Sequence, residues 1–278
     1  MIGIHSFWSK PLLNNRWDEE GSFDKSLYLM ALSLKTMKAV FDRVELVTDI
    51  KGAELLKHLD YDAVHLDLED LNDEHPRYWS VGKIYSLKRY NEPVCHVDGD
   101  VFFLDSNIKS LFDDNYDGIV QMKEIGNHYH KTYADLIIKM SPALADIDLS
   151  VYNFAYNCGV MGFKNMYFMK DFISTYFMIL ESCKKNQNII DNVGGEYEIN
   201  IVIEQSLLTH VAQHNNMHMK EIIPIDKQTN PGLQPYAESL GYVHLWGKSK
   251  YQDHWQDKVK KRLKELDITT YNKITLKK

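Results

Sequence analysis

The sequence predicts an α/β protein with a mostly parallel central sheet flanked by helices, and three observations predict it. Short apolar runs typical of buried strands alternate with longer segments whose apolar residues recur at helical spacing, which is the pattern of βαβ units. A chain of 278 residues with 44% hydrophobic residues can bury a full core without disulfide or zinc staples. No internal repeat and no linker of biased composition interrupts the chain, so we expect a single domain.

The first half of the chain shows the alternation most clearly. Ile2–Phe7 is a short apolar run, and Asp24–Phe41 carries apolar side chains at helical spacing behind Asp24, which is a typical N-cap residue. The next elements are predicted in this order: strand Val44–Thr48, helix Ala53–His58, strand Ala63–Leu66, helix Val81–Tyr90 and strand Val94–Val97.

The second half has a looser rhythm. Polar stretches with glycine or proline predict loops at 186–198 and 229–235. The predicted strands are Gly118–Gln121, Asn157–Phe163, Met219–Ile223 and Gly241–Leu245. The predicted helices are Tyr129–Met140, Met166–Lys185, Ile199–His214 and Gln252–Leu266.

Charge and composition exclude several classes of protein. A net charge of −7 argues against a nucleic-acid partner. The three cysteines form no CxxC pair, so they indicate a reducing compartment. The N-terminus lacks the features of a signal peptide and no run of 18 apolar residues occurs, so we expect a cytoplasmic protein. The segment Lys258–Lys278 holds eight Lys/Arg and two acids, which makes it a candidate contact for the inner face of an anionic membrane.

The strongest local signal follows the strand Val94–Val97. Asp98 and Asp100 are separated only by a glycine, at the carboxyl end of a parallel strand, where ligands bind in open α/β sheets. Two carboxylates on such a turn can share one hard divalent cation, which can in turn hold a diphosphate. The plainer interpretation is a polar turn, because Asp-Gly is common turn chemistry.

The same motif opens the haloacid-dehalogenase type of phosphotransferase, in which the first Asp is a nucleophile and the second a general acid/base. There it normally lies on the first strand of the core, whereas about 95 residues with three apparent strands precede it here. A phosphotransferase using Asp98 and Asp100 is therefore kept as the alternative enzyme class.

A second constellation lies near the end of the chain. The segment 241–250 reads GYVHLWGKSK, with His244 at the end of a predicted strand, Gly247 three residues later and Lys250 three after that. Imidazole is a metal ligand, glycine allows backbone N–H groups to approach phosphate, and lysine neutralises diphosphate charge. Together with Asp98 and Asp100, this segment would form a site for a metal ion and a diphosphate from distant parts of the chain.

These segments resemble a GT-A-fold glycosyltransferase, closest in pattern to glycosyltransferase family 8 and divergent from it. The GT-A fold is a Rossmann-like nucleotide-diphospho-sugar transferase fold. Four segments carry the resemblance in the right order: Asp98–Asp100, Asn157–Phe163 (NCGVMGF), Glu204–Leu208 (EQSLL) and His244–Lys250 (HLWGKSK).

The resemblance implies a role for each matching residue. Asp98, Asp100 and His244 would bind Mn²⁺ or Mg²⁺, with Asp100 also counted as catalytic, and Gly247 and Lys250 would contact the diphosphate of a UDP-linked sugar. In the same way, Asn157 would lie near the donor sugar, Gln205 and Glu204 would lie beside the anomeric carbon as catalytic residues, Lys83 would touch donor phosphate or sugar, and His5 and Ser6 would line the nucleobase pocket.

The resemblance also implies an activity and an organisation. It implies transfer of a hexose, with retention of configuration, to a glycan, lipid-linked or protein acceptor, as in the assembly of cell-envelope polysaccharide. A non-catalytic relative that binds nucleotide sugar or glycan is the remaining alternative. Residues 1–250 would form the GT-A domain, with a donor-binding half at about 1–120 and an acceptor-side half at about 121–250. Residues 251–278 would form a basic C-terminal helix or tail.

Overall fold

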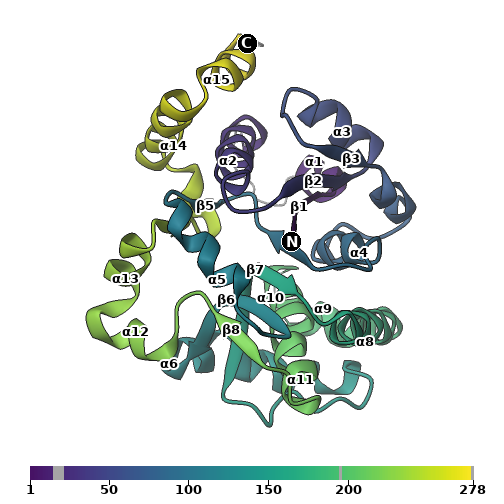
Figure 1. The fold of residues 1–278 in the computed structure, drawn as a ribbon. Coiled ribbons are helices and arrows are strands. Elements are labelled where there is room, and N and C mark those ends of the chain that lie inside the picture. The colour runs from purple at the N-terminus through teal and green to yellow at the C-terminus, as the bar shows by residue number, and fades with distance from the viewer. Residues whose placement is uncertain (15–21, 194–195, 277–278) are drawn as a thin grey trace.

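The computed structural model describes residues 1–14, 22–193 and 196–276 (Figure 1). Its strands are β1 (Ile2–Phe7), β2 (Arg43–Thr48), β3 (Ala63–His65), β4 (Val94–Val97), β5 (Val101–Phe103), β6 (Gly118–Ile125), β7 (Phe154–Phe163), β8 (Met219–Glu221) and β9 (Tyr242–His244). Its helices are α1 (Ser9–Leu13), α2 (Ser22–Met37), α3 (Ile50–Leu56), α4 (Val81–Leu87), α5 (Ser110–Asp113), α6 (Gly126–Tyr129), α7 (Asp135–Met140), α8 (Met166–Lys185), α9 (Gln187–Val193), α10 (Glu196–Ile201), α11 (Leu207–His214), α12 (Ile225–Lys227), α13 (Leu233–Ser239), α14 (Asp253–Leu266) and α15 (Ile268–Thr275).

Seven strands form the central sheet in the order β3-β2-β1-β4-β7-β6-β8. Every neighbouring pair is parallel except the two that involve β7, which runs antiparallel to β4 and to β6. The predicted α/β class with a mostly parallel sheet flanked by helices is therefore confirmed. The four residues of β4 are all buried, as expected for a strand covered on both faces.

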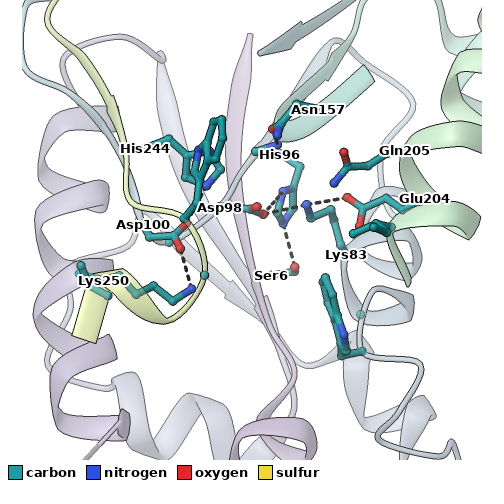
Figure 2. Close-up of a pocket in the computed structure, with 18 of the residues that line it drawn as sticks. Ser6, Lys83, His96, Asp98, Asp100, Asn157, Glu204, Gln205, His244 and Lys250 are labelled. Atoms are coloured by element: carbon teal, nitrogen blue, oxygen red, sulfur yellow. Dashed lines mark hydrogen bonds and ion pairs between the residues drawn. The ribbon is translucent and has the colours of Figure 1, made fainter. Parts of the chain in front are cut away.

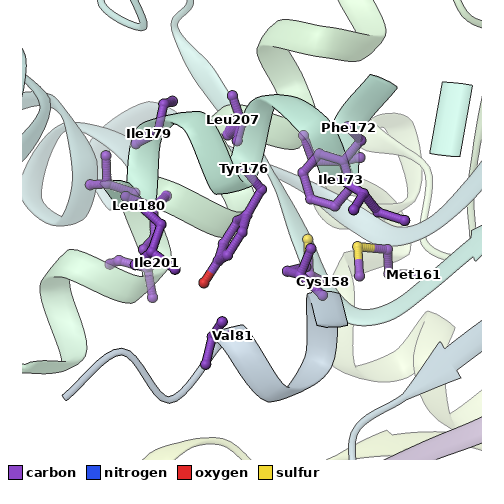
Figure 3. Close-up of a cluster of buried hydrophobic side chains, with 14 of the residues drawn as sticks. Val81, Cys158, Met161, Phe172, Ile173, Tyr176, Ile179, Leu180, Ile201 and Leu207 are labelled. Carbon is purple, nitrogen blue, oxygen red and sulfur yellow. The ribbon is translucent and has the colours of Figure 1, made fainter. Parts of the chain in front are cut away.

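The core lies on both faces of this sheet because neighbouring strand residues point in opposite directions. In β6, Ile119 belongs to the cluster beneath α2 and α14, and Val120 to the cluster beneath α4, α8 and α11. Figure 3 shows part of the second cluster, in which Tyr176 of α8 points toward Val81 of α4. Cys158 and Met161 of β7 belong to the same cluster.

Hydrogen bonds within this second cluster fix helix α4, which carries a predicted site residue. The hydroxyl of Tyr176 lies 2.8 Å from Oγ of Ser80, and Ser80 also donates from its backbone N–H and its hydroxyl to Oδ1 of Asn200. Ser80 immediately precedes α4, so α8 and α10 together set the position of that helix.

A second, two-stranded sheet pairs β5 with β9 in antiparallel fashion. The strand predicted at Gly241–Leu245 thus exists, but it lies outside the central sheet. Its register sets His244 opposite Val101, the residue that follows Asp100. This small sheet brings the end of the chain back to the segment after β4.

The C-terminal helices return to the N-terminal half. Figure 1 shows α14 beside α2, with α15 continuing to the C-terminus. Val259, Leu263 and Ile274 bury their side chains there, and the hydroxyl of Tyr28 in α2 lies 3.2 Å from that of Thr275. The last two residues of the predicted basic tail lie outside the described residues. Within the described ranges, no helix is both long and apolar enough to cross a bilayer.

Several predicted elements need correction. Helix α2 already includes Asp24 in its first turn, so Asp24 is not its N-cap. The predicted loop at 186–198 holds α9 and the start of α10, while its Gly194-Gly195 pair lies outside the described residues. Helix α13 begins at Leu233, inside the loop predicted at 229–235. Strand β5 and helix α15 were missed because both are short.

Candidate active site

A cavity lies at the carboxyl ends of β1 and β4. After β1 the chain builds β2 and β3 on one side, and it then returns to place β4 on the other side of β1. Such a reversal leaves a crevice beyond the strand ends, where ligands bind in open α/β sheets. The cavity has a volume of about 430 Å³. Of the residues predicted from the sequence, those that line it are Ser6, Lys83, Asp98, Asp100, Asn157, Glu204, Gln205, His244, Gly247 and Lys250 (Figure 2).

Three side chains with metal-ligating atoms meet in this cavity. Ligand atoms of Asp98, Asp100 and His244 all lie within 4.8 Å of one another. The two acids follow β4 in a tight turn, in which the N–H of Val101 donates to the carbonyl of Asp98 at 3.0 Å. Two carboxylates and one imidazole are a donor set that suits Mn²⁺ or a similar divalent cation.

The hydrogen bonds of His244 fit a metal-ligating role. Its Nδ1 lies 2.7 Å from Oε1 of Gln121, which also accepts a hydrogen bond from the hydroxyl of Tyr242 at 2.9 Å. An amide oxygen can only accept, so Nδ1 carries the proton of the neutral ring and Nε2 presents its lone pair. That nitrogen faces Oδ1 of Asp100 at 3.3 Å, where a cation or a proton is needed between two electron-rich atoms. The side chains present therefore fit a divalent cation, with Gln121 orienting one ligand.

Two glycines are required by this arrangement. A Cβ atom on Gly159 in β7 would lie 2.5 Å from Cε1 of His244 and 2.6 Å from Oε1 of Gln121, so a side chain there would displace the imidazole. Gly247 adopts a φ of +57°, in the left-handed region that favours glycine. It begins the turn Gly247–Tyr251, which returns Lys250 to the cavity.

Lys250 and Asp100 form a buried ion pair. Nζ of Lys250 lies 2.7 Å from Oδ2 of Asp100, on the opposite oxygen from the one that faces His244 (Figure 2). Burial alone would raise the pKa of Asp100, but the Lys250 ammonium holds it well below its ordinary value. Asp100 is therefore an anion at neutral pH.

Lys83 joins two more carboxylates on the other side of the site. Its Nζ lies 2.8 Å from Oδ1 of Asp98, 2.7 Å from Oε1 of Glu204 and 3.1 Å from the carbonyl oxygen of Cys158. Burial opposes the charge on Lys83, but Asp98 and Glu204 outweigh it and raise the pKa of the ammonium above its ordinary value. The ammonium therefore holds both acids in place.

His96 lies beneath this cluster and stays neutral. Its Nε2 lies 2.8 Å from Oγ of Ser6, and its Nδ1 lies 3.7 Å from Oδ1 of Asp98. Burial first, and then the charge of Lys83 and the ring of His5, lower the pKa of His96 well below its ordinary value. Ser6, at the end of β1, is thus joined to the strand that carries the acids.

The predicted sugar-side residues form one network with side chains that the sequence did not single out. Nδ2 of Asn157 donates to Oε1 of Glu124 at 2.5 Å, and Oδ1 of Asn157 accepts from the N–H of Gly159. The hydroxyl of Tyr133 lies 2.6 Å from Oε2 of Glu124 and 2.7 Å from Oε1 of Gln205. Glu124 therefore joins Asn157 to Gln205 across the cavity.

One predicted site residue is misplaced. His5 does not line the cavity: its ring is buried between α2 and the segment after α3, with Nδ1 2.7 Å from the hydroxyl of Tyr61 and Nε2 3.0 Å from Oγ of Ser33. Burial lowers the pKa of His5 to about 3. The reason is the alternation of β1, which turns Ser6 toward the cavity and its neighbour toward the core.

Three residues that line or support the site, Gln121, Glu124 and His128, were not predicted as site residues from the sequence. Gln121 and Glu124 are polar residues in a strand whose other residues are mostly apolar, and both are buried. A buried polar residue in an apolar strand is a usable signal, because it requires a partner. His128 follows Glu124 after a turn at Gly126, where φ is +60°.

The fold and the site together define an α/β protein with a candidate divalent-cation centre at the crevice where its strand order reverses. The chain belongs to the family of unknown function DUF6734, whose model matches residues 1–277. No curated protein matches the chain.

Solved structures with a similar backbone include three transferases. A galactosyltransferase, LgtC, solved with donor and acceptor sugar analogues, is 13% identical, with a TM-score of 0.41 and coverage of 74% of this chain and 71% of that one. Mouse xyloside xylosyltransferase 1 is 10% identical, with a TM-score of 0.36 and coverage of 80% and 85%. The inositol-1-phosphate CTP transferase from T. maritima is 14% identical, with a TM-score of 0.41 and coverage of 94% and 96%.

Proposed function

We propose that this chain is a metal-dependent glycosyltransferase of the GT-A type, which transfers a sugar from a UDP-linked donor to a glycan, lipid-linked or protein acceptor. One observation carries the proposal. The ligand atoms of Asp98 and Asp100 lie within 4.8 Å of those of His244, which follows them by about 145 residues in the chain. They do so in a cavity that the other matching segments also line.

The diphosphate end of the cavity is proposed at Asp98, Asp100, His244, Gly247 and Lys250. The two acids and the imidazole would hold a divalent cation, which when bound would neutralise charge on the departing nucleoside diphosphate. Lys250 would add a second positive charge on the same diphosphate. The left-handed conformation of Gly247 would let backbone N–H groups approach the same diphosphate.

The sugar end is proposed at Asn157, Glu204 and Gln205. Glu204 is almost completely buried and its Oε1 is held by Lys83 at 2.7 Å, so we assign it a positioning and electrostatic role beside the anomeric carbon and not that of a nucleophile. Gln205 and Asn157 offer amide groups to sugar hydroxyls. Retention of configuration is proposed from the family resemblance.

The phosphotransferase alternative is less well supported by the geometry. It requires Asp98 as a nucleophile, whereas Oδ1 of Asp98 is paired with Lys83 at 2.8 Å. Its motif belongs on the first strand of the core, whereas here it follows β4, the fourth strand in chain order. A histidine completes the ligand set, where that class requires further acids.

The test is the melting temperature of the purified protein against a panel of nucleotides and nucleotide sugars, with and without Mn²⁺. A ligand that binds the native state raises the melting temperature by mass action, so no acceptor is needed. We expect a Mn²⁺-dependent rise with one UDP-sugar for the wild type and for Asp73→Ala, an exposed acid outside the cavity, and none for Asp100→Asn.

Other outcomes would assign other functions. Stabilisation by Mg²⁺ with a phosphate mimic, and by no nucleotide, would contradict the transferase and favour the phosphotransferase. Donor binding without release of the sugar to water or to any glycan offered would identify a binding protein. No response to any ligand would contradict the proposed donor site.

A further inference from the structure

A carboxylate–imidazole pair lies in the wall of the cavity, at the end of β6. Glu124 is the last but one residue of the strand, and the left-handed turn at Gly126 leads into the short helix that carries His128. The turn sets the two side chains together, with Nε2 of His128 2.8 Å from Oε2 of Glu124.

Glu124 is built to stay ionised. Both of its oxygens receive hydrogen bonds, Oε1 from Asn157 and Oε2 from His128 and Tyr133. Burial would raise the pKa of this carboxyl, but the three donors outweigh burial and lower it below the ordinary value. A buried anion is therefore fixed beside the imidazole.

Unlike the buried Glu124, His128 is exposed to the cavity. Its side chain is 54% exposed and lines the cavity. Because Nε2 is committed to Glu124, Nδ1 is the ring nitrogen that has no hydrogen-bond partner among the described residues. The charged and titratable groups that face the ring are Glu124 from β6 and, through it, the hydroxyl of Tyr133. The hydrogen bond that His128 donates to Glu124 raises the pKa of His128 above its ordinary value, so the ring is a stronger base than a free imidazole.

Hydrogen bonds connect the pair to the proposed sugar end of the site. Asn157 donates to the same carboxylate, and Tyr133 bridges it to Gln205. One oriented imidazole nitrogen is therefore left on the cavity wall beside the residues assigned to the sugar, which is the arrangement of a general base held by a carboxylate.

We propose that His128, held by Glu124, is the general base that accepts the proton of the acceptor hydroxyl. The proton passes from the acceptor oxygen to Nδ1 of the neutral ring while that oxygen forms a bond to the anomeric carbon on the face that the diphosphate leaves, as the proposed retention requires. The bond from the anomeric carbon to the diphosphate oxygen breaks, and the diphosphate leaves with the electron pair. The proton then passes from Nδ1 to water. Glu124 is the positioning residue of the pair, and the inference rests on the proposed glycosyl transfer.

The alternative is a purely structural role, in which His128 only holds Glu124 in place. The pH dependence of the rate of sugar release separates the two roles. Water serves as the acceptor, so the assay is release of sugar from the UDP-sugar that gives the largest Mn²⁺-dependent thermal shift. The rate is measured from pH 5 to pH 9 on the wild type, His128→Gln, His128→Ala and Glu124→Gln. His130→Gln is the matched control, because His130 is exposed, lies two residues away and does not line the cavity.

For the wild type and the control, we expect the rate to rise with pH through an apparent pKa above 6.5. His128→Gln is expected to lose roughly 100- to 10,000-fold in rate and the rise with pH, while the thermal shift with donor and Mn²⁺ stays unchanged. Added imidazole is expected to restore rate to His128→Ala, and Glu124→Gln to move the apparent pKa downward. A purely structural role predicts none of the changes in pH profile and no rescue.

The outcomes separate the inference from the function on which it rests. If His128→Gln binds donor and releases sugar with the wild-type rate and pH profile, the base assignment is wrong and the transferase stands. If the wild type shows no donor-dependent thermal shift, or binds donor and releases no sugar, the proposed function is wrong and the base assignment falls with it.

Discussion

Lys250 is paired with one of the carboxylates that we assign to the proposed divalent cation. In this structure its ammonium neutralises Asp100, a carboxylate that we assign to the metal, at 2.7 Å. Both side chains are buried, so water screens the pair poorly. A cation that binds without nucleotide must break the ion pair between Asp100 and Lys250. It then remains close to the unpaired ammonium, which repels it. A diphosphate would give that ammonium a new partner, so metal and nucleotide are predicted to bind cooperatively through Lys250.

The size of this effect follows from the ion pair. Its charge centres lie roughly 4 Å apart, and at an effective dielectric constant of about 20 the attraction is about 4 kcal/mol. Part of this attraction is regained when the ammonium of Lys250 forms hydrogen bonds to other oxygen atoms or to water. A remaining coupling of about 1–3 kcal/mol corresponds to about a 5- to 150-fold change in an affinity. Replacing Lys250 by methionine should therefore tighten metal binding in the absence of nucleotide by about 10-fold or more.

The assay is Mn²⁺ binding, followed by the electron paramagnetic resonance signal of the free ion, with and without UDP. For the wild type we expect UDP to tighten Mn²⁺ binding strongly. For Lys250→Met we expect tighter binding of Mn²⁺ alone, weaker binding of UDP, and a smaller effect of each ligand on the other. Lys250→Arg keeps the charge and should keep the cooperativity. Lys139→Met, which removes an exposed charge on α7, should behave as the wild type.

The reasoning is refuted if Lys250→Met binds Mn²⁺ alone no more tightly than the wild type. It is also refuted if UDP still tightens Mn²⁺ binding by the wild-type factor in that variant. Either result would mean that the ammonium does not compete with the cation for Asp100.

Two further predictions test the groups that hold the ligands. Gln121→Met removes the acceptor that fixes the tautomer of His244, and about a 10- to 100-fold loss of Mn²⁺ affinity is expected by calorimetric titration; an unchanged affinity would show that the imidazole needs no such support. Lys83→Met leaves Glu204 buried without its ammonium and should lower the free energy of unfolding by about 3–5 kcal/mol. The double variant with Glu204→Gln should recover most of that loss in chemical denaturation, and strict additivity of the two losses would contradict the coupling.

The acids and the histidine of the proposed metal centre could be predicted from the sequence because each lies at the end of a strand that is itself easy to recognise. Asp98 and Asp100 follow four buried residues of β4, and His244 ends the apolar run of β9. The two acids lie at the carboxyl end of a parallel strand, where ligands bind in open α/β sheets. His244 ends a strand outside the central sheet, and its place beside the acids was implied by the family resemblance. The pairing of Lys250 with Asp100 was not predictable, because it depends on how the turn at Gly247 closes.

The supporting groups were missed for a different physical reason. Pairing of β6 with β7 follows one register up to Val120, opposite Met161, and resumes at Met122, opposite Asn157. Three residues of β7, Cys158 to Val160, therefore lie opposite one residue of β6, Gln121, and Gly159 is at the centre of the irregularity. A bulge of this kind redirects side chains and leaves backbone groups unpaired within the ladder. It turns Gln121 toward His244, and the carbonyl of Gly159 accepts the N–H of Asp98 at 2.8 Å.

Backbone groups of Gly159 also satisfy polar atoms of the site. The carbonyl of Gly159 extends the β4–β7 ladder to Asp98, and the N–H of Gly159 is held by the side chain of Asn157. The missing side chain of Gly159 also makes room for the imidazole. Alternation of apolar and polar residues predicts which face a strand residue occupies, but it assumes a regular register. The sequence pattern therefore does not predict side-chain directions at the point where β7 departs from that register. The candidate metal centre lies at the same point.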